Sequence, residues 1–205
     1  EAEAAARELL EMVLADLAVR DGFEVGDDMV TRPDGVTVPL DRDAPLLTLG
    51  RLCQEDFCIL QPGAGGEHVL TGAILCFPAS WTLAEKFMRP LIRIHKPVPP
   101  YDDGIARRVQ RLFDAVRPGQ VLWRANAHFY EEPALFAPRP EAAPRSKVTG
   151  EPPYLRSERQ CVLRLPKTGA GVFSIHTWML RTTDLSDSQK AALNAQSVAD
   201  RDVTS

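Results

Sequence analysis

The chain has 205 residues, of which 44% are hydrophobic and 25% charged, and a formal net charge of −4 at pH 7. These values are ordinary for a globular protein, and they give no indication of a nucleic-acid partner or a membrane surface. No apolar run approaches the roughly 20 residues that span a bilayer, and the length suits one large domain over residues 1–205. The four cysteines do not pair as CxxC, which argues against a zinc ribbon and favours free thiols in a cytoplasmic protein.

The first twenty residues predict a helix. Apolar residues recur there at helical spacing, which indicates one buried face. That face holds Leu10, Val13, Leu14 and Leu17, and Gly22 marks the end of the helix. Because the chain opens on a helical pattern and without Met, we expect it to begin inside a domain.

Five β-prone runs separated by Gly- or Pro-containing turns predict antiparallel strands. The runs cover residues 54–60, 69–77, 121–129, 154–165 and 171–180. The pattern predicts an α+β fold, in which an antiparallel sheet is flanked by helices, with helical extensions at the N- and C-terminal ends.

Three further helices are expected between and after these strands. One begins at Ser80 as N-cap, the second covers roughly Gly104 to Val116, and the third follows Ser186 as N-cap. Residues 137–153, rich in Pro, Ala and charge, predict a long surface loop.

His95 lies between an apolar approach and a proline-rich exit, Lys96-Pro97-Val98-Pro99-Pro100. Each proline fixes its own φ and pushes the preceding residue towards extended backbone. Lys96 and Val98 are therefore predicted to be extended, and His95 to end a regular element. Such a restrained imidazole suits a metal or heme ligand, but a histidine at a helix end without a special partner fits the same pattern.

The other histidines, His68, His128 and His176, do not pair at spacings such as HxxxH or HExxH. This argues against a zinc hydrolase. A site of two histidines and one carboxylate holding iron across strands stays open.

Polar residues alternate along two of the predicted strands. Arg124, Asn126 and His128 share one face of the first, and alternate residues of Arg156-Ser157-Glu158-Arg159-Gln160 share one face of the second. Such a row either protects an exposed sheet edge with charge or lines a pocket, where a carboxylate beside guanidinium groups holds a cationic substrate or relays a proton.

Taken in order over roughly residues 45 to 180, these segments resemble the alpha subunit of heme-dependent oxidative N-demethylase and its relatives. The motifs that carry the resemblance are Gln54-Glu55-Asp56-Phe57, Phe77-Pro78-Ala79-Ser80-Trp81, Glu85-Lys86, Ile94-His95-Lys96-Pro97-Val98-Pro99 with Tyr101, Trp123-Arg124-Ala125-Asn126, Leu135-Phe136, Arg156-Ser157-Glu158-Arg159-Gln160, Leu163-Arg164-Leu165-Pro166 and Val172-Phe173-Ser174-Ile175-His176-Thr177.

The resemblance implies a PAS-like fold that binds heme b. It also implies an oxidoreductase of the monooxygenase type, which removes a methyl group from a small secondary amine with dioxygen and with electrons from a reductase partner. Formaldehyde or its folate adduct would be the carbon product. The alternative is a PAS-like heme- or ligand-binding sensor, or a non-catalytic module, and an oligomer is compatible with either.

Residue roles follow from the same resemblance. His95 is implied as the proximal heme ligand, with His128 as the alternative. Arg124 would face the distal side and hydrogen-bond dioxygen, and Glu158 would pair with the amine or relay protons. Candidates for contacts to the heme propionates, or for structural ion pairs, are Arg156, Arg159 and Arg164.

Two positions depart from the family's pattern. Ala127 stands where relatives usually carry Trp after the Arg-x-Asn motif, and His176 stands where relatives often carry Arg. If these residues line the pocket, substrate choice or activity differs from that of the relatives.

Overall fold

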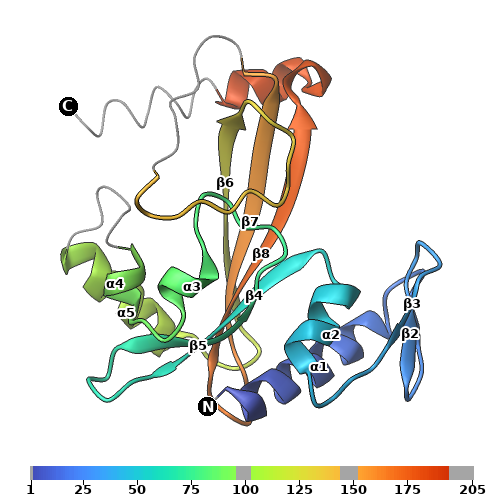
Figure 1. Ribbon diagram of the computed structural model, residues 1–205, viewed down its shortest axis with the longest axis vertical. Helices are drawn as coiled ribbons and strands as arrows, with labels where there is room; N and C mark the ends of the chain where they lie inside the picture. Colours follow the sequence, from blue (N-terminus) through green and yellow to red (C-terminus); the bar gives the residue numbers. More distant parts are fainter. Residues whose placement is uncertain (1, 96–102, 144–151, 194–205) are drawn as a thin grey trace.

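A five-stranded antiparallel sheet organises the computed structural model, which describes residues 2–95, 103–143 and 152–193 (Figure 1). The helices are α1 (Glu3–Leu17), α2 (Pro45–Leu52), α3 (Leu83–Lys86), α4 (Leu91–His95) and α5 (Asp103–Ala115). The strands are β1 (Glu24–Val25), β2 (Met29–Thr31), β3 (Thr37–Pro39), β4 (Glu55–Pro62), β5 (His68–Ile74), β6 (Val121–Tyr130), β7 (Tyr154–Arg164) and β8 (Gly171–Arg181).

The strand order of the large sheet is β5-β4-β8-β7-β6, and each neighbouring pair is antiparallel. The predicted hairpins form: β4 pairs with β5, and β7 with β8. The short strands β1, β2 and β3 make a separate small sheet. These findings confirm the α+β class and the antiparallel sheet with flanking helices, while the PAS-like assignment stays a prediction.

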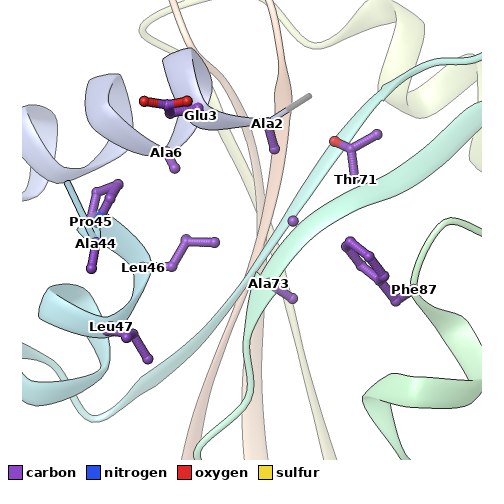
Figure 2. Close-up of a pocket in the computed structure, with 11 residues that line it drawn as sticks. Ala2, Glu3, Ala6, Ala44, Pro45, Leu46, Leu47, Thr71, Ala73 and Phe87 are labelled. Atoms are coloured by element: carbon purple, nitrogen blue, oxygen red, sulfur yellow. The ribbon is translucent and has the colours of Figure 1, made fainter.

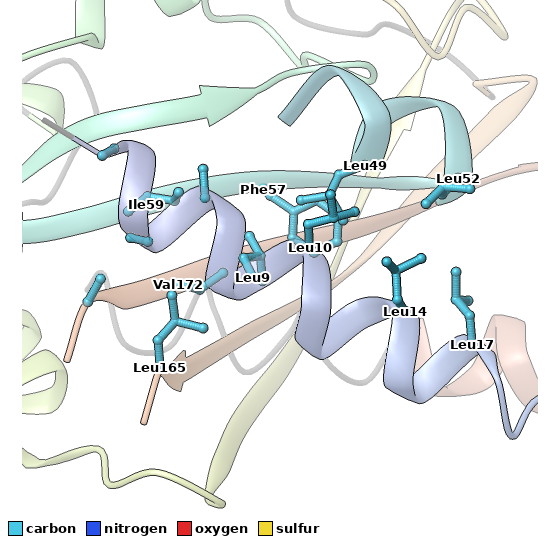
Figure 3. Close-up of a cluster of buried hydrophobic side chains, with 14 of the residues drawn as sticks. Leu9, Leu10, Leu14, Leu17, Leu49, Leu52, Phe57, Ile59, Leu165 and Val172 are labelled. Carbon is cyan, nitrogen blue, oxygen red and sulfur yellow. The ribbon is translucent and has the colours of Figure 1, made fainter. Parts of the chain in front are cut away.

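Helices α1 and α2 cover one face of the sheet and build the main core with it (Figure 3). The predicted stripe of α1 is buried at Leu10, Leu14 and Leu17, and Leu9 is buried as well, whereas Val13 is only partly covered. Figure 3 shows Leu9 and Leu10 close to Phe57 of β4, with Leu14 and Leu17 further along the helix. This hydrophobic contact holds the N-terminal helix on the sheet.

Helices α4 and α5 pack on the opposite face. Leu91 of α4 and Phe113 of α5 are buried together with Leu60 of β4. Gly171 leaves room for this contact, because a Cβ atom there would lie 3.1 Å from the ring of Phe113. Leu112, the residue before Phe113, is 39% exposed, because it points away from this contact.

The carboxylate of Glu8 fastens α1 to the turn between β7 and β8. It accepts hydrogen bonds from the backbone N–H groups of Lys167 and Thr168, at 2.6 and 2.8 Å. Burial raises the pKa of Glu8, but the hydrogen bonds from Thr168 and Lys167 outweigh it and hold the pKa below its usual value. The ionised carboxylate therefore stabilises the fold.

The ends of the short helices test the predicted caps. The helix expected from Ser80 begins at Leu83 instead, because Ser80 has a φ of 60°, outside the helical region. Ser186 does cap the C-terminal helix, whose described part covers 187–193: its Oγ accepts from the N–H of Gln189, and the Gln189 side chain accepts from the N–H of Ser186.

His95 is the last residue of α4 that the structure describes, and the predicted end of the element at this residue stays a prediction. The extended backbone expected at Lys96 and Val98 lies outside the described residues, as does part of the predicted loop 137–153. Within the described residues, no helix is both long and apolar enough to cross a membrane.

Candidate functional site

The imidazole of His95 is oriented by a backbone contact. Its Nδ1 lies 2.9 Å from the carbonyl oxygen of Leu91, one turn earlier in α4. Since a carbonyl only accepts, this contact places the proton on Nδ1 and the lone pair of the neutral ring on Nε2. Burial lowers the pKa of His95, and the charges of Lys86 and Arg124 lower it further against the opposing effect of Leu91. The ring is thus held in the neutral form that binds metals.

Lys86 holds the end of α4 in place. Its side chain is buried, and Nζ donates to the carbonyl oxygen of Ile94 at 2.7 Å. The ammonium group also lies 5.4 Å from the ring centroid of Trp81. Burial lowers the pKa of Lys86. The residue therefore ties α3 to the backbone immediately before His95.

A polar network crosses β6 and β7 on the side of the sheet that carries α4. In the strand register, Arg124 lies opposite Gln160 and Asn126 opposite Glu158. Arg124 Nε donates to Gln160 Oε1 at 2.8 Å, and Gln160 Nε2 donates to Glu158 Oε2 at 3.1 Å. Asn126 Nδ2 lies 3.4 Å from the same carboxylate oxygen. The predicted rows thus join, and Gln160 links Arg124 to Glu158.

Two acceptor positions of this network are open to a further donor. Glu158 accepts three hydrogen bonds, one on Oε1 and two on Oε2, out of about four that a carboxylate can accept. The Oδ1 atom of Asn126 is buried and has no hydrogen-bond partner among the described residues. A cationic N–H donor fits such a pair of oxygens.

Arg156 forms the base of the network. Its side chain is 1% exposed, and its Nε donates to Glu158 Oε1 at 3.0 Å. The terminal nitrogens donate to the carbonyl oxygens of Leu135 and Phe77 at 3.0 and 2.5 Å, and one lies 3.3 Å from Thr177 Oγ1. The guanidinium therefore fixes Glu158 and two backbone segments at once.

Asp56 holds the segment that Arg156 contacts. The Asp56 side chain is buried on β4, and its Oδ1 accepts from the N–H groups of Cys76 and Phe77 at 2.6 and 2.9 Å. Burial raises the pKa of Asp56, against the effect of these donors and of Arg156. Sequence reasoning missed this role, although an acidic residue opening the apolar run 57–60 was a visible signal.

The other predicted site residues lie apart from this network. Arg159 pairs with Glu55 at 3.1 Å on the face that carries α1 and α2. Arg164 donates from all three guanidinium nitrogens to the carbonyl oxygens of Val116, Gly169 and Phe113. His128 lies opposite Arg156 in the register and is exposed. The contacts of the arginines support their structural alternative, and a role at the propionates stays a prediction.

Two cavities lie elsewhere in the fold. A cavity of about 400 Å³ lies beside β5, between the starts of α1 and α2 and the ring of Phe87 (Figure 2). Another, of about 500 Å³, lies between α1 and the turn at Pro166. Neither is lined by His95, Arg124 or Glu158. The described residues hold no group of three side chains suited to a metal ion, whereas heme iron needs only an axial ligand from the protein.

A family model described as haem-dependent oxidative N-demethylase, alpha subunit-like, matches residues 1–201. The chain belongs to this family. The family name indicates heme dependence, an oxidative demethylation and the role of one subunit in a larger enzyme. The resemblance found in the motifs is confirmed over nearly the whole chain.

The two departures from the N-demethylase pattern do not face the network. Ala127 pairs with Ser157 and His176 with Arg159, and both partners flank Glu158 on β7 and point to the opposite face of the sheet. They therefore lie on the face that carries α1 and α2. There His176 Nδ1 is 3.6 Å from Glu55, and burial lowers the pKa of His176 against the effect of that carboxylate. The network with Arg124 and Glu158 is unaffected by either departure.

Proposed function

We propose that this chain binds heme b through His95 and removes a methyl group from a small secondary amine, using dioxygen and electrons from a reductase partner. One observation carries the proposal: an oriented neutral imidazole, a guanidinium and a carboxylate lie on the same side of the sheet, in a member of the N-demethylase family. The reaction consumes dioxygen, electrons and protons, and releases the shortened amine, formaldehyde and water.

The donor set of the site fits heme. Nε2 of His95 would be the ligating atom, since Nδ1 lies at the carbonyl oxygen of Leu91, and a carbonyl partner on the other ring nitrogen orients and strengthens an imidazole ligand. Lys86 fixes the backbone beside it. Heme, when bound, supplies the redox chemistry for the oxidation of the methyl group.

Arg124 is proposed to donate hydrogen bonds to dioxygen. Its Nε is held by Gln160, which orients the guanidinium and leaves the terminal nitrogens to act as donors. The charge of Arg124 acts on His95, since it contributes to the lowered pKa of that ring. A cation close to the proposed ligand favours the negative charge that develops on dioxygen as it is reduced.

Glu158 is proposed to bind the amine. Most secondary amines are protonated at neutral pH, and an ammonium group donates to carboxylate and amide oxygens. Glu158 has one acceptor position left, and Asn126 Oδ1 lies in the same network. Gln160 connects the carboxylate to Arg124, so a proton can be held at Glu158 beside the group proposed to contact dioxygen.

Hemin titration followed by absorption spectroscopy tests the heme site. We expect a Soret band in the wild-type chain, lost or shifted in His95→Ala and recovered when imidazole is added. His128→Ala is the matched control and keeps the wild-type spectrum. A chain that takes up no hemin, or one whose spectrum depends on His128 and not on His95, contradicts the assignment.

Formaldehyde release tests the reaction. The heme-loaded chain is supplied with a secondary N-methylamine, dioxygen and a reductant. We expect release to fall at least 100-fold in Arg124→Ala and Glu158→Gln, with the Soret band retained, because general acid–base and electrostatic contributions are of about this size. Heme binding without formaldehyde in the wild type would indicate the sensor alternative.

A further inference from the structure

The two edges of the large sheet differ in their backbone hydrogen bonds to neighbouring segments. At the β5 edge, Leu70 exchanges hydrogen bonds with the segment after α3: Met88 N–H donates to its carbonyl at 2.8 Å, and its own N–H donates to Arg89 at 3.1 Å. A bridge between Val69 and Pro90 continues this cover. No backbone hydrogen bond between described residues joins the outer edge of β6 to another segment. Figure 1 shows β6 as the outer strand on its side of the sheet.

Apart from the charge of Arg124, strand β6 lacks the features that usually protect an open edge. It has ten residues, and none of them is proline, glycine or lysine. Large apolar side chains are exposed on both of its faces: Leu122 on one, and Trp123 and Phe129 on the other, with Trp123 70% exposed. A long edge strand with large exposed apolar side chains is a template for pairing with another strand.

We propose that β6 pairs with β6 of a second copy of this chain, antiparallel and about a two-fold axis at Asn126. Opposite residues then have numbers that add to a constant, so every residue from Leu122 to Tyr130 finds a partner in the same segment. Trp123 meets Phe129 of the second copy, and Ala125 meets its Ala127. The two five-stranded sheets become one.

The side chains favour a second copy as the occupant because the strand is complementary to itself in this register. Two Trp–Phe pairs form on one face, and aromatic cross-strand pairs stabilise sheets. With the axis shifted to Ala125, Trp123 would meet Ala127 and both aromatic pairs would be lost. In an antiparallel pair, two residues opposite each other point to the same face of the sheet, so the exposed apolar side chains of the two copies meet each other.

The pairing brings the two candidate sites to the same side of one continuous sheet. Arg124 of each chain then lies opposite His128 of the second copy. This pairing is independent of heme, and it adds an imidazole from the second copy next to the guanidinium proposed to contact dioxygen.

Charge substitutions at Ala125 and Ala127 test the register. The double variant Ala125→Glu/Ala127→Glu sets like charges opposite each other twice, whereas Ala125→Glu/Ala127→Lys sets opposite charges in the same places. Within one chain the two variants alter the same two side chains, so the second is a matched control. Two symmetric pairs give an expected difference in dimer dissociation constant of roughly tenfold or more.

Sedimentation velocity over a range of concentrations, with and without hemin, measures this effect on chains of 22.6 kDa. Circular dichroism checks that each variant is folded. We expect a dimer for the wild type and for the Glu/Lys variant, and dissociation of the Glu/Glu variant. The proposal is overturned by a monomeric wild type, by a Glu/Glu variant that dimerises as well as the Glu/Lys variant, or by a folded Glu/Lys variant that is monomeric.

Discussion

Replacing Arg156 by Met is expected to destabilise the fold strongly. Methionine keeps much of the side-chain length but removes the partner of Glu158, whose side chain is only 12% exposed, and the donors to two carbonyl oxygens. Removing one member of a buried ion pair leaves an uncompensated charge and costs about 3–5 kcal/mol. Typical stabilities are about 5–15 kcal/mol, so the variant loses a large part of its free energy of unfolding.

Arg159→Met is the matched control on the same strand. Arg159 pairs with Glu55 at a similar distance, 3.1 Å, but its side chain is 44% exposed. Solvent-exposed ion pairs contribute about 0–1 kcal/mol, because water screens both charges. The two variants make the same chemical change, so the difference between them measures the effect of burial.

Urea denaturation at pH 7, followed by circular dichroism, measures both variants. A third variant, Arg156→Met/Glu158→Gln, also removes the unpaired charge of Glu158. It is expected to recover about 1–2 kcal/mol of the lost free energy of unfolding. If Arg156→Met unfolds within 1 kcal/mol of Arg159→Met, Arg156 is not the structural anchor described above. A stable Arg156→Met chain with weakened hemin binding would support the propionate role instead.

Three further effects follow from the hydrogen bonds and the burial of single side chains. Asp56→Ala leaves two backbone N–H groups without their acceptor and is expected to lower the free energy of unfolding by about 2 kcal/mol, while Asp56→Asn, which keeps an oxygen there, loses less than half as much in the same urea titration. The folded-state pKa of Glu8 is lowered, so its ionised carboxylate contributes stability that is present above the unfolded pKa and is lost as pH falls through the folded pKa. Glu8→Gln should therefore flatten the dependence of melting temperature on pH below about pH 4.5. An unchanged slope would contradict this. Burial raises the pKa values of Cys53 and Cys58 to about 12, so iodoacetamide at pH 8 should alkylate them in the urea-unfolded chain and hardly at all in the native chain, as mass spectrometry of the peptides would show.

Alternation along the strands could be predicted from the sequence, because the side-chain period of two depends on the backbone alone. Arg124 and Asn126 do share a face, as do Glu158 and Gln160. Which residue of β6 meets which residue of β7 could not be predicted, since more than twenty residues connect the two strands and a connection of that length fixes no register. The hydrogen bond between Arg124 and Gln160 could therefore not be predicted from the sequence.

Predictions from single residues failed where a tertiary contact decides the outcome. Ser80 has the chemistry of an N-cap, but its N–H donates to Ala137 at 3.0 Å, and its backbone adopts a positive φ. Lys86 carries a charge in a short helix, yet its side chain is buried, and its Nζ donates to the carbonyl oxygen of Ile94. In both cases the partner is distant in sequence or lies on another helix, and no local pattern indicates it.

The departures at Ala127 and His176 show how strand parity changes a functional interpretation. Because Ala127 and His176 differ from the residues that relatives carry, they suggested an altered pocket. That interpretation assumed that the neighbours of Asn126 and Thr177 point into the pocket. Successive strand residues point to opposite faces, so these two side chains lie with Trp178 and Glu55, behind the sheet. His176 contacts Trp178 there, with ring centroids 4.2 Å apart. Substitution at His176 thus changes an aromatic surface and substitution at Ala127 changes the proposed β6 interface, and both leave the donors and acceptors of Arg124 and Glu158 in place.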